Sequence, residues 1–182
     1  MLFADDIVIM AETEEQLQKL LNFVNDWCRK WRMKVNKDKT KVMHFRRKAH
    51  NRTNSTFYLG GNELEIVDEY KYLGVFLDEY LDYNTCANIL AGAAGRALGG
   101  IISKFKSIKN VGFETFTKFY HSGIVPIIDY CSGFWGFKTY NECNKIQQRA
   151  LRYFVGVHSK SPLLALEGDT GWLNGEKTCG NV

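Results

Sequence analysis

Proline and closely spaced cysteines are scarce in this sequence. Only two prolines occur among 182 residues, which argues against a long extended linker. The five cysteines are widely scattered, and because no Cys-x-x-Cys pair occurs, neither a disulfide framework nor a zinc module is predicted. An intracellular, reducing environment in the nucleus or the cytoplasm is therefore expected.

Long apolar runs are also missing. No stretch approaches about 18 uninterrupted apolar residues, so we expect no membrane span and no membrane partner. The N-terminus lacks a basic region followed by an apolar stretch and a small-residue cleavage site, so no signal peptide is expected. Hydrophobic residues at 45% and charged residues at 24% are typical of a globular chain that buries a core.

Charge is distributed unevenly along the chain, whose net charge is +4. Residues 1–28 carry six acidic residues and one basic residue, whereas residues 29–52 carry eleven basic residues and one acidic residue. Seven acidic residues and one basic residue follow in residues 62–82. Such zones suit a protein that holds metal ions at one place and a polyanion beside it. A solvated surface of helix and loop explains the same charges about equally well.

The first ten residues hold the pattern around which the chain is organised. Two short apolar runs, residues 1–3 and 7–10, flank Ala4, Asp5 and Asp6, which predicts a tight hairpin with two carboxylates at its tip. Adjacent carboxylates repel one another, and a divalent cation such as Mg²⁺ relieves that repulsion. For this short pattern alone, an ordinary Asp-rich turn is the better interpretation.

An amphipathic helix is predicted over residues 14–32. Thr13 and Gln16 fit a capping box at its start, and apolar residues follow at three- and four-residue spacing. We expect this apolar stripe to pack on the sheet that carries the Asp pair. Its members are Leu17, Leu20, Leu21, Val24, Trp27, Cys28 and Trp31.

Strands are predicted in the stretch that follows this helix. Residues 40–45 are expected to form a strand with Lys39 at its start, and residues 57–67 a hairpin that turns at two glycines. The aromatic and β-branched residues 70–77 predict one further strand.

The second half of the chain is expected to be helical. Helices are predicted over residues 82–107 and 113–121, and a third after a capping box at residues 139–142. Each glycine in the first of these helices costs about 1 kcal/mol relative to alanine, so packing must hold the helix or it breaks near Gly99 and Gly100.

The order of these patterns resembles the back half of the palm of a reverse transcriptase, most closely the LINE-type enzymes of non-LTR retrotransposons. The matching residues are Phe3-Ala4-Asp5-Asp6, Val35-Asn36 with Lys39-Thr40, Tyr72-Leu73-Gly74, and the segment 126–156. The resemblance implies an α+β fold. Residues 1–81 would form a partial polymerase palm, an antiparallel sheet with a packed helix. Residues 82–160 would form a helical thumb-like region, and residues 161–182 a poorly structured tail.

The resemblance also implies a chemistry, RNA-directed DNA polymerisation by two-metal nucleotidyl transfer. Asp5 and Asp6 would be catalytic residues that bind Mg²⁺ or Mn²⁺, and Lys39 would support the triphosphate of the incoming nucleotide. The partners would be an RNA template, a DNA primer and deoxynucleotide triphosphates. A structural role for Asp6, in which its carboxylate accepts hydrogen bonds from backbone N–H groups, agrees with the sequence equally well. For Lys39 the alternative is a solvent-exposed lysine at the start of a strand.

Two groups of residues would contact nucleic acid. Arg46, Arg47 and Lys48 would bind phosphates, which contributes affinity without sequence information. Tyr72, Leu73 and Gly74 (resembling the primer grip) would position the primer end. A plain buried strand explains the second group almost as well.

One departure from the family pattern limits the expected activity. The family holds its metals with three carboxylates, and the first comes from an earlier motif that this sequence does not contain. We therefore expect a fragment that lacks the fingers, binds metal weakly or not at all, and does not polymerise DNA alone. The alternatives are a non-catalytic nucleic-acid-binding module that uses residues 29–52, and an unrelated α/β protein.

Overall fold

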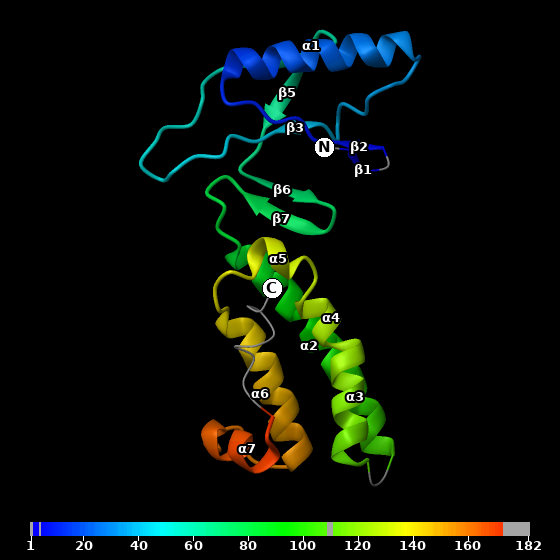
Figure 1. The fold of residues 1–182 in the computed structure, drawn as a ribbon, viewed down its shortest axis with the longest axis vertical. Helices are drawn as coiled ribbons and strands as arrows, with labels where there is room; N and C mark the ends of the chain where they lie inside the picture. Colours follow the sequence, from blue (N-terminus) through cyan, green and yellow to red (C-terminus); the bar gives the residue numbers. More distant parts are fainter. Residues whose placement is uncertain (1, 4, 109–110, 173–182) are drawn as a thin grey trace. The chain divides into compact units, whose positions relative to one another are not determined.

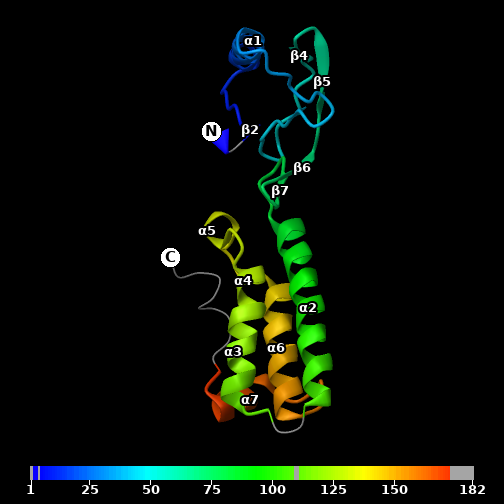
Figure 2. The same ribbon diagram turned by 90° about the vertical axis from the view of Figure 1, so that its right-hand side faces the viewer.

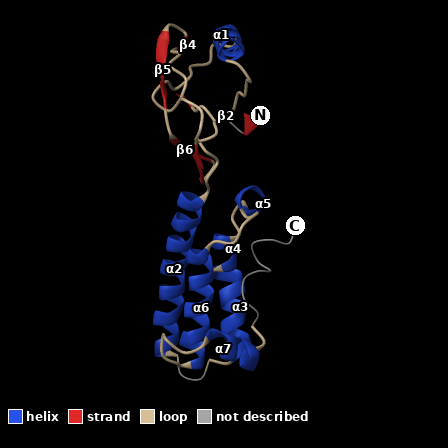
Figure 3. Cartoon of the chain, turned by 90° about the vertical axis from the view of Figure 1, so that its left-hand side faces the viewer, coloured by secondary structure: helices blue, strands red, loops and turns tan. Residues whose placement is uncertain are grey.

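Strands and helices are segregated along the chain (Figures 1 and 3). The computed structural model describes residues 2–3, 5–108 and 111–172. The chain divides into two compact units, Met1–Asp82 (unit 1) and Tyr83–Val182 (unit 2). All the described strands lie in unit 1, whereas the regular elements described in unit 2 are all helices. The class is α+β, as predicted.

A three-stranded mixed sheet forms the centre of unit 1. Strand β5 (Asn62–Ile66) lies between β3 (Lys41–Val42), which runs parallel to it, and β4 (Phe57–Leu59), which runs antiparallel. Gly60 and Gly61 have φ of 58° and 80°, the left-handed values that a two-residue hairpin turn requires. The predicted hairpin is confirmed, whereas the strand predicted over residues 40–45 is reduced to two residues.

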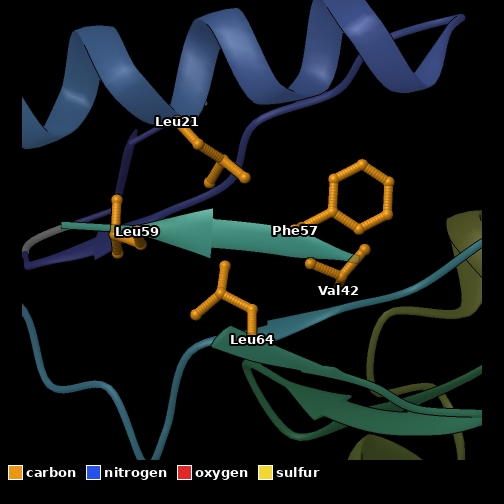
Figure 4. Packing of buried hydrophobic residues seen from close by; sticks show 5 residues of the cluster. All are labelled: Leu21, Val42, Phe57, Leu59 and Leu64. Carbon is orange, nitrogen blue, oxygen red and sulfur yellow. The ribbon is translucent and has the colours of Figure 1, made fainter. Parts of the chain in front are cut away.

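Helix α1 (Glu14–Lys30) covers this sheet. Its start is as predicted, because the Gln16 amide donates to Thr13 Oγ1 at 3.2 Å. Leu21 packs into a buried apolar cluster with residues of all three strands (Figure 4); the strand residues are Val42, Phe57, Leu59 and Leu64.

Gln18 joins α1 to the edge strand β4. Its side-chain amide donates to the Tyr58 carbonyl at 2.8 Å, and its Oε1 accepts from the Tyr58 amide at 2.9 Å. The helix therefore satisfies backbone groups that an edge strand otherwise leaves unpaired.

The prediction that the apolar stripe of α1 packs on the sheet carrying the Asp pair is wrong. Strands β1 (Leu2–Phe3) and β2 (Asp6–Ile7) pair with each other in a separate sheet, and α1 packs on β4 instead. Trp27 and Trp31 are 41% and 62% exposed. Apolar residues spaced three and four apart form two neighbouring stripes on the surface of α1. Only the stripe that contains Leu21 and Cys28 is buried.

Residues 70–77 form a hairpin rather than the single strand that was predicted. Strands β6 (Glu69–Tyr72) and β7 (Val75–Asp78) pair antiparallel around Leu73 and Gly74, whose φ values are 47° and 85°. Leu73 is a bulky residue in the left-handed region, which the sequence pattern did not anticipate because glycine or asparagine is the usual residue there.

Unit 2 is built around the long helix α2 (Asn84–Ser107), which packs against α6 (Asn141–Val155) and the short α4 (Val125–Ile128) (Figure 2). Helix α3 (Phe113–Gly123) packs on α4, and α5 (Ser132–Trp135) is a single turn. The buried core includes Leu98, Phe116, Trp135 and Leu151. Helix α2 is not broken at its glycines, because burial of Ala94 and Leu98 on the same helix compensates for the low helix propensity of the glycines.

Helix α2 is also the one described helix long and apolar enough to cross a membrane by length and composition. Ala94 and Leu98 on this helix are fully buried within unit 2. The core helix of a globular unit gives the same signal, so this test does not favour a span.

Two boundaries in unit 2 differ from those predicted. Helix α6 begins after Tyr140 without a side-chain cap, so the predicted capping box that starts at residue 139 does not form. Residues 161–182 were expected to be a poorly structured tail, yet Leu163–Thr170 forms helix α7, because Leu166 is buried and Gly171 supplies a left-handed C-cap. Residues 173–182 lie outside the described part of the chain.

The turn of the β6–β7 hairpin generates a stability prediction. A leucine in the left-handed region costs roughly 1–2 kcal/mol, and asparagine tolerates this conformation far better. Leu73→Asn is expected to raise the free energy of unfolding by about 0.5–1 kcal/mol, measured by urea denaturation. Leu20→Asn, the same change at an exposed position of α1, is the control and should not stabilise. A loss of stability in Leu73→Asn would show that contacts of the leucine side chain outweigh its backbone strain.

Candidate functional site

Asp5 and Asp6 lie at the tip of the β1–β2 hairpin. Phe3 pairs with Asp6 and Leu2 with Ile7, so Asp5 lies in the turn and Asp6 is the first residue of β2. Both aspartates are exposed. The prediction of a tight hairpin with two carboxylates at its tip is confirmed.

The carboxylates of Asp5 and Asp6 are suited to bind Mg²⁺ as part of its coordination shell. This ion is commonly held by one or two carboxylates, with waters and substrate phosphates completing its coordination. In the part of the chain that the structure describes, no three His, Cys, Asp or Glu side chains gather into a metal-binding group. The hairpin therefore offers a partial donor set that needs oxygen ligands from a substrate or another segment.

Lys39 lies on a loop whose backbone is well fixed. The side-chain oxygen of Asn36 accepts from the amides of Asp38 at 3.1 Å and Lys39 at 3.3 Å. The Tyr70 hydroxyl donates to the Lys39 carbonyl at 2.8 Å. The Lys39 side chain is exposed, and no ion pair between described residues joins it to Asp5 or Asp6. The structure thus brings Lys39 to the β6–β7 hairpin.

Tyr72, Leu73 and Gly74 form the end of that hairpin. Tyr72 is the last residue of β6, and the other two are the turn itself. The Tyr72 hydroxyl oxygen is buried and has no hydrogen-bond partner among the described residues. A buried polar atom without a partner is costly, and such atoms occur at sites where a ligand completes the hydrogen bonding.

Arg46 is held inside unit 1 by an ion pair that the sequence did not reveal. Its Nε and Nη2 donate to the two carboxylate oxygens of Glu79 at 3.1 and 2.8 Å, and its guanidinium lies 4.7 Å from the centre of the Tyr80 ring. The Arg46 and Glu79 side chains are only 14% and 8% exposed. The Tyr80 hydroxyl and the Arg46 guanidinium hold the pKa of the Glu79 carboxyl below its ordinary value.

This pairing changes the interpretation of the triplet of Arg46, Arg47 and Lys48. The charge of Arg46 is neutralised by Glu79, so the prediction that this residue contacts phosphate gains no support from its surroundings. Arg47 and Lys48 are exposed, which leaves their phosphate contacts as a prediction.

The eleven basic residues of positions 29–52 separate into two groups. Three are partly buried and paired: Lys41 with Glu65 at 2.6 Å, Arg46 with Glu79 at 2.8 Å, and Arg52 with Asp68 at 2.5 Å. The other eight are exposed and form no ion pair with a described residue. They are Arg29, Lys30, Arg32, Lys34, Lys37, Lys39, Arg47 and Lys48.

Glu14 is a second acid whose role the sequence did not show. Its carboxylate accepts hydrogen bonds from the hydroxyls of Ser55 and Thr53, and these bonds lower the pKa of Glu14. They attach the loop before β4 to the first turn of α1. A serine and a threonine in a polar loop carry no sequence signal for a partner about forty residues away.

The first 77 residues of the chain match a known protein family. Residues 1–77 match the family described as reverse transcriptase (RNA-dependent DNA polymerase). This range contains the Asp hairpin, Lys39 and the β6–β7 turn.

Individual relatives extend the similarity into unit 2. The RNA-directed DNA polymerase from mobile element jockey of Drosophila funebris is 24% identical, over 85% of this chain and 18% of that protein. The probable RNA-directed DNA polymerase from transposon BS of Drosophila melanogaster is 25% identical, over 82% of this chain and 18% of that protein. A putative uncharacterised transposon-derived protein of Caenorhabditis elegans is 29% identical, over 85% of this chain and 56% of that protein.

The chain therefore spans less than a fifth of the length of the two named polymerases. No solved structure matches it.

The lowered pKa values of Glu79 and Glu14 generate a prediction of pH dependence. An acid whose pKa is lower in the folded state stabilises the fold above its unfolded pKa, roughly 4.3, and loses that contribution as pH falls through the folded pKa. The urea midpoint should therefore decline between about pH 5 and pH 3.

In Glu79→Gln this decline should be smaller, and the midpoint at pH 7 should be lower because Arg46 loses its partner. The exposed Glu63 on β5 provides the control. Glu63→Gln should leave unchanged both the decline of the urea midpoint with falling pH and the midpoint at pH 7. Equal pH profiles of Glu79→Gln and the unchanged protein would contradict the role assigned to this pair.

Proposed function

We propose, from the premise that this chain belongs to the LINE-type reverse transcriptases, that unit 1 supplies catalytic aspartates for RNA-directed DNA polymerisation. The observation that carries this proposal is the position of Asp5 and Asp6 at the tip of a tight hairpin, within the residues that match the family. Because the chain spans 18% of each named polymerase, this activity is proposed for the polymerase of which such a chain is a part.

Asp5 and Asp6 would hold Mg²⁺ or Mn²⁺ through their carboxylate oxygens. When bound, such an ion stabilises negative charge on phosphoryl oxygens and favours attack by a hydroxyl group at neutral pH. Two exposed carboxylates without a third bind a divalent ion weakly, so we expect weak or absent binding by the chain alone.

Lys39 and the β6–β7 turn would bind the substrates. An exposed ammonium group on a loop fixed by Asn36 and Tyr70 is suited to neutralise the triphosphate of an incoming deoxynucleotide. The Tyr72-Leu73-Gly74 turn would contact the end of a DNA primer paired with an RNA template. The DNA primer and the RNA template are both found inside cells, which supports an intracellular site of action in the nucleus or the cytoplasm.

Primer extension tests this proposal. The chain alone should not extend a DNA primer on an RNA template with either Mg²⁺ or Mn²⁺. A chimera in which this chain replaces the aligned segment of the jockey polymerase should extend the primer. Asp5→Asn in the chimera should lower the rate at least about a hundredfold, because a metal ligand contributes several kcal/mol to transition-state stabilisation.

Asp26→Asn, which removes an exposed carboxylate from α1, is the control and should leave extension by the chimera unchanged. Extension by the chain alone that disappears in Asp5→Asn would overturn the claim that more of a polymerase is needed. An active chimera that is insensitive to Asp5→Asn would overturn the catalytic assignment.

The eight exposed cations of residues 29–52 that pair with no described carboxylate favour a second candidate function, nucleic-acid binding without catalysis. Exposed lysine and arginine side chains displace counterions from phosphates, which gives affinity without sequence preference. This candidate requires no metal and no third carboxylate.

Arg47→Gln combined with Lys48→Gln tests this second candidate. The double variant should weaken binding of single-stranded RNA and reduce the slope of log K against log salt by about 1.4, or about 0.7 for each lost phosphate contact. Fluorescence anisotropy at several salt concentrations measures both quantities. Lys104→Gln combined with Lys118→Gln makes the same change of charge in unit 2, and an equal loss in this control would exclude a specific role for Arg47 and Lys48.

A further inference from the structure

Helix α1 carries an apolar row that remains open to solvent. Its members follow one another at spacings of three or four residues, so they share one face of the helix and its C-cap: Leu20, Phe23, Trp27 and Trp31. Phe23 is the most exposed of the four, at 68%. Contiguous exposed apolar side chains mark surfaces that bind another macromolecule, whereas single ones do not. This apolar row of α1 is therefore a candidate docking surface.

The area of the apolar row suits a small protein–protein interface. Large aromatic side chains bury about 150–250 Å² each, so the exposed parts of Phe23, Trp27 and Trp31 amount to about 300–400 Å². Two such rows facing each other would bury about 600–800 Å² from these rings alone. Leu20 and the polar side chains beside the row bring the total toward the roughly 1,000 Å² of a weak but specific interface.

A row of charged side chains flanks the apolar row. Its four members are exposed, and none forms an ion pair with a described residue: Glu15, Lys19, Asp26 and Lys30. At 100° per residue they lie within about 60° of one another around the helix axis. The buried residues Leu21 and Cys28 lie on the opposite side of the apolar row. A partner that docks on the apolar row therefore meets charges along one flank.

The order of these charges is self-complementary. Glu15 and Lys30 lie equally far in sequence from the peptide bond between residues 22 and 23, which is close to the middle of α1. Lys19 and Asp26 are centred on the same bond. Reversing the direction of the helix therefore places every acid of the row opposite a base. A second α1 helix, running antiparallel to the first, has the charge pattern that this flank requires.

We propose that α1 docks on a second copy of this chain, with the two α1 helices antiparallel across a twofold axis. Such an axis brings the same flank of both helices together, so the two charged rows face each other. Parallel helices would instead place each charged row against the sheet-facing side of the partner helix. The self-complementary order of charges thus selects the antiparallel arrangement.

The same register aligns the apolar rows. Phe23 lies near the twofold axis and packs against its counterpart, and Trp27 lies opposite Leu20 of the other copy. Glu15 pairs with Lys30 of the other copy at both ends of the interface. This association requires no metal, nucleotide or nucleic acid, and primer extension does not depend on it.

Sedimentation equilibrium of the full chain tests the association. Over about 1–300 μM the chain should show a monomer–dimer equilibrium with Kd on the order of 10–100 μM, as expected for a small interface. A chain that stays monomeric over this range would overturn the proposal and leave the apolar row to another segment of a longer polymerase.

Reversing charges tests the antiparallel register. Glu15→Lys and Lys30→Glu should each raise Kd about fivefold at low salt, because a rim pair becomes repulsive at two symmetric places. The double variant should restore the Kd of the unchanged chain. Glu63→Lys, which makes the same change of charge at an exposed position of β5, is the control and should leave Kd unchanged.

Restoration in the double variant distinguishes a contact between copies from an effect within one helix. Glu15 and Lys30 are about 22 Å apart along α1, too far to pair within a single chain. Both reversals also oppose the helix dipole, so a purely structural effect would make the double variant the weakest of the three. A double variant that dimerises no better than the single variants would overturn the antiparallel pairing.

A mixture of the two single variants provides an independent check. One chain then presents two positive charges at positions 15 and 30, and the other presents two negative charges. The mixture should form heterodimers at concentrations where each variant alone is mainly monomeric, as measured by sedimentation velocity with one variant fluorescently labelled. No preference for the heterodimer would contradict the proposal.

Phe23→Gln tests the apolar part of the interface. Because Phe23 is largely exposed within one chain, its replacement should leave the urea midpoint unchanged while it raises Kd at least about tenfold. Leu164→Gln removes an exposed apolar side chain from α7 and is the control, for which Kd should not change. An equal rise of Kd in both variants would show nonspecific association and would overturn the proposal.

These outcomes are separate from those of the catalytic proposal. Asp5→Asn should dimerise as the unchanged chain does, since the readout is association in the absence of metal and substrates. A dimeric chain with an inactive polymerase chimera would support the α1 interface and count against catalysis, and the reverse result would do the opposite.

Discussion

The ion pair between Arg46 and Glu79 is the interaction on which the arrangement of unit 1 depends. It joins the loop after β3 to the residue that follows β7, although these strands share no sheet in the described part of the chain. Both side chains are largely removed from water, so each charge requires the other. The backbone bond from the Arg46 amide to the Glu79 carbonyl, at 2.9 Å, reinforces the connection. A separate hydrogen bond from the Tyr70 hydroxyl to the Lys39 carbonyl, at 2.8 Å, holds the β6–β7 hairpin beside the loop that carries Lys39.

Burial separates structural charges from those available to a ligand. In residues 29–52, the three partly buried cations each have a carboxylate partner, whereas the eight exposed cations form no ion pair with any residue that the structure describes. This division follows from the high cost of removing an unpaired charge from water. The positive surface that remains is therefore smaller than the composition suggests, and it is concentrated before β3 and at Arg47 and Lys48.

Unit 2 achieves its packing with small residues. Ala91, Ala94 and Leu98 of α2 are buried, and a Cβ atom built at Gly95 would lie 3.4 Å from the Ile146 side chain of α6. Alanine and glycine allow the two helices to approach closely, and dispersion contacts then compensate for the lower helix propensity of glycine.

The sequence by itself determined the features that short stretches of chain encode. The Thr13 cap and the apolar spacing after it define α1, and the two glycines at positions 60 and 61 define the β4–β5 turn. The Asp hairpin follows in the same way from its flanking apolar runs. These features were predicted correctly because capping, periodicity and a positive φ act over a few residues.

Tertiary structure alone decided which side chains are buried and which cations are free. Trp27 and Trp31 remain exposed because α1 packs on β4, and Arg46 is neutralised because Glu79, 33 residues away, reaches it. Helix α7 forms where no periodic pattern marked it, because Leu166 is buried in the fold. Each of these outcomes depends on a contact between residues far apart in the chain, and no local pattern specifies such a contact.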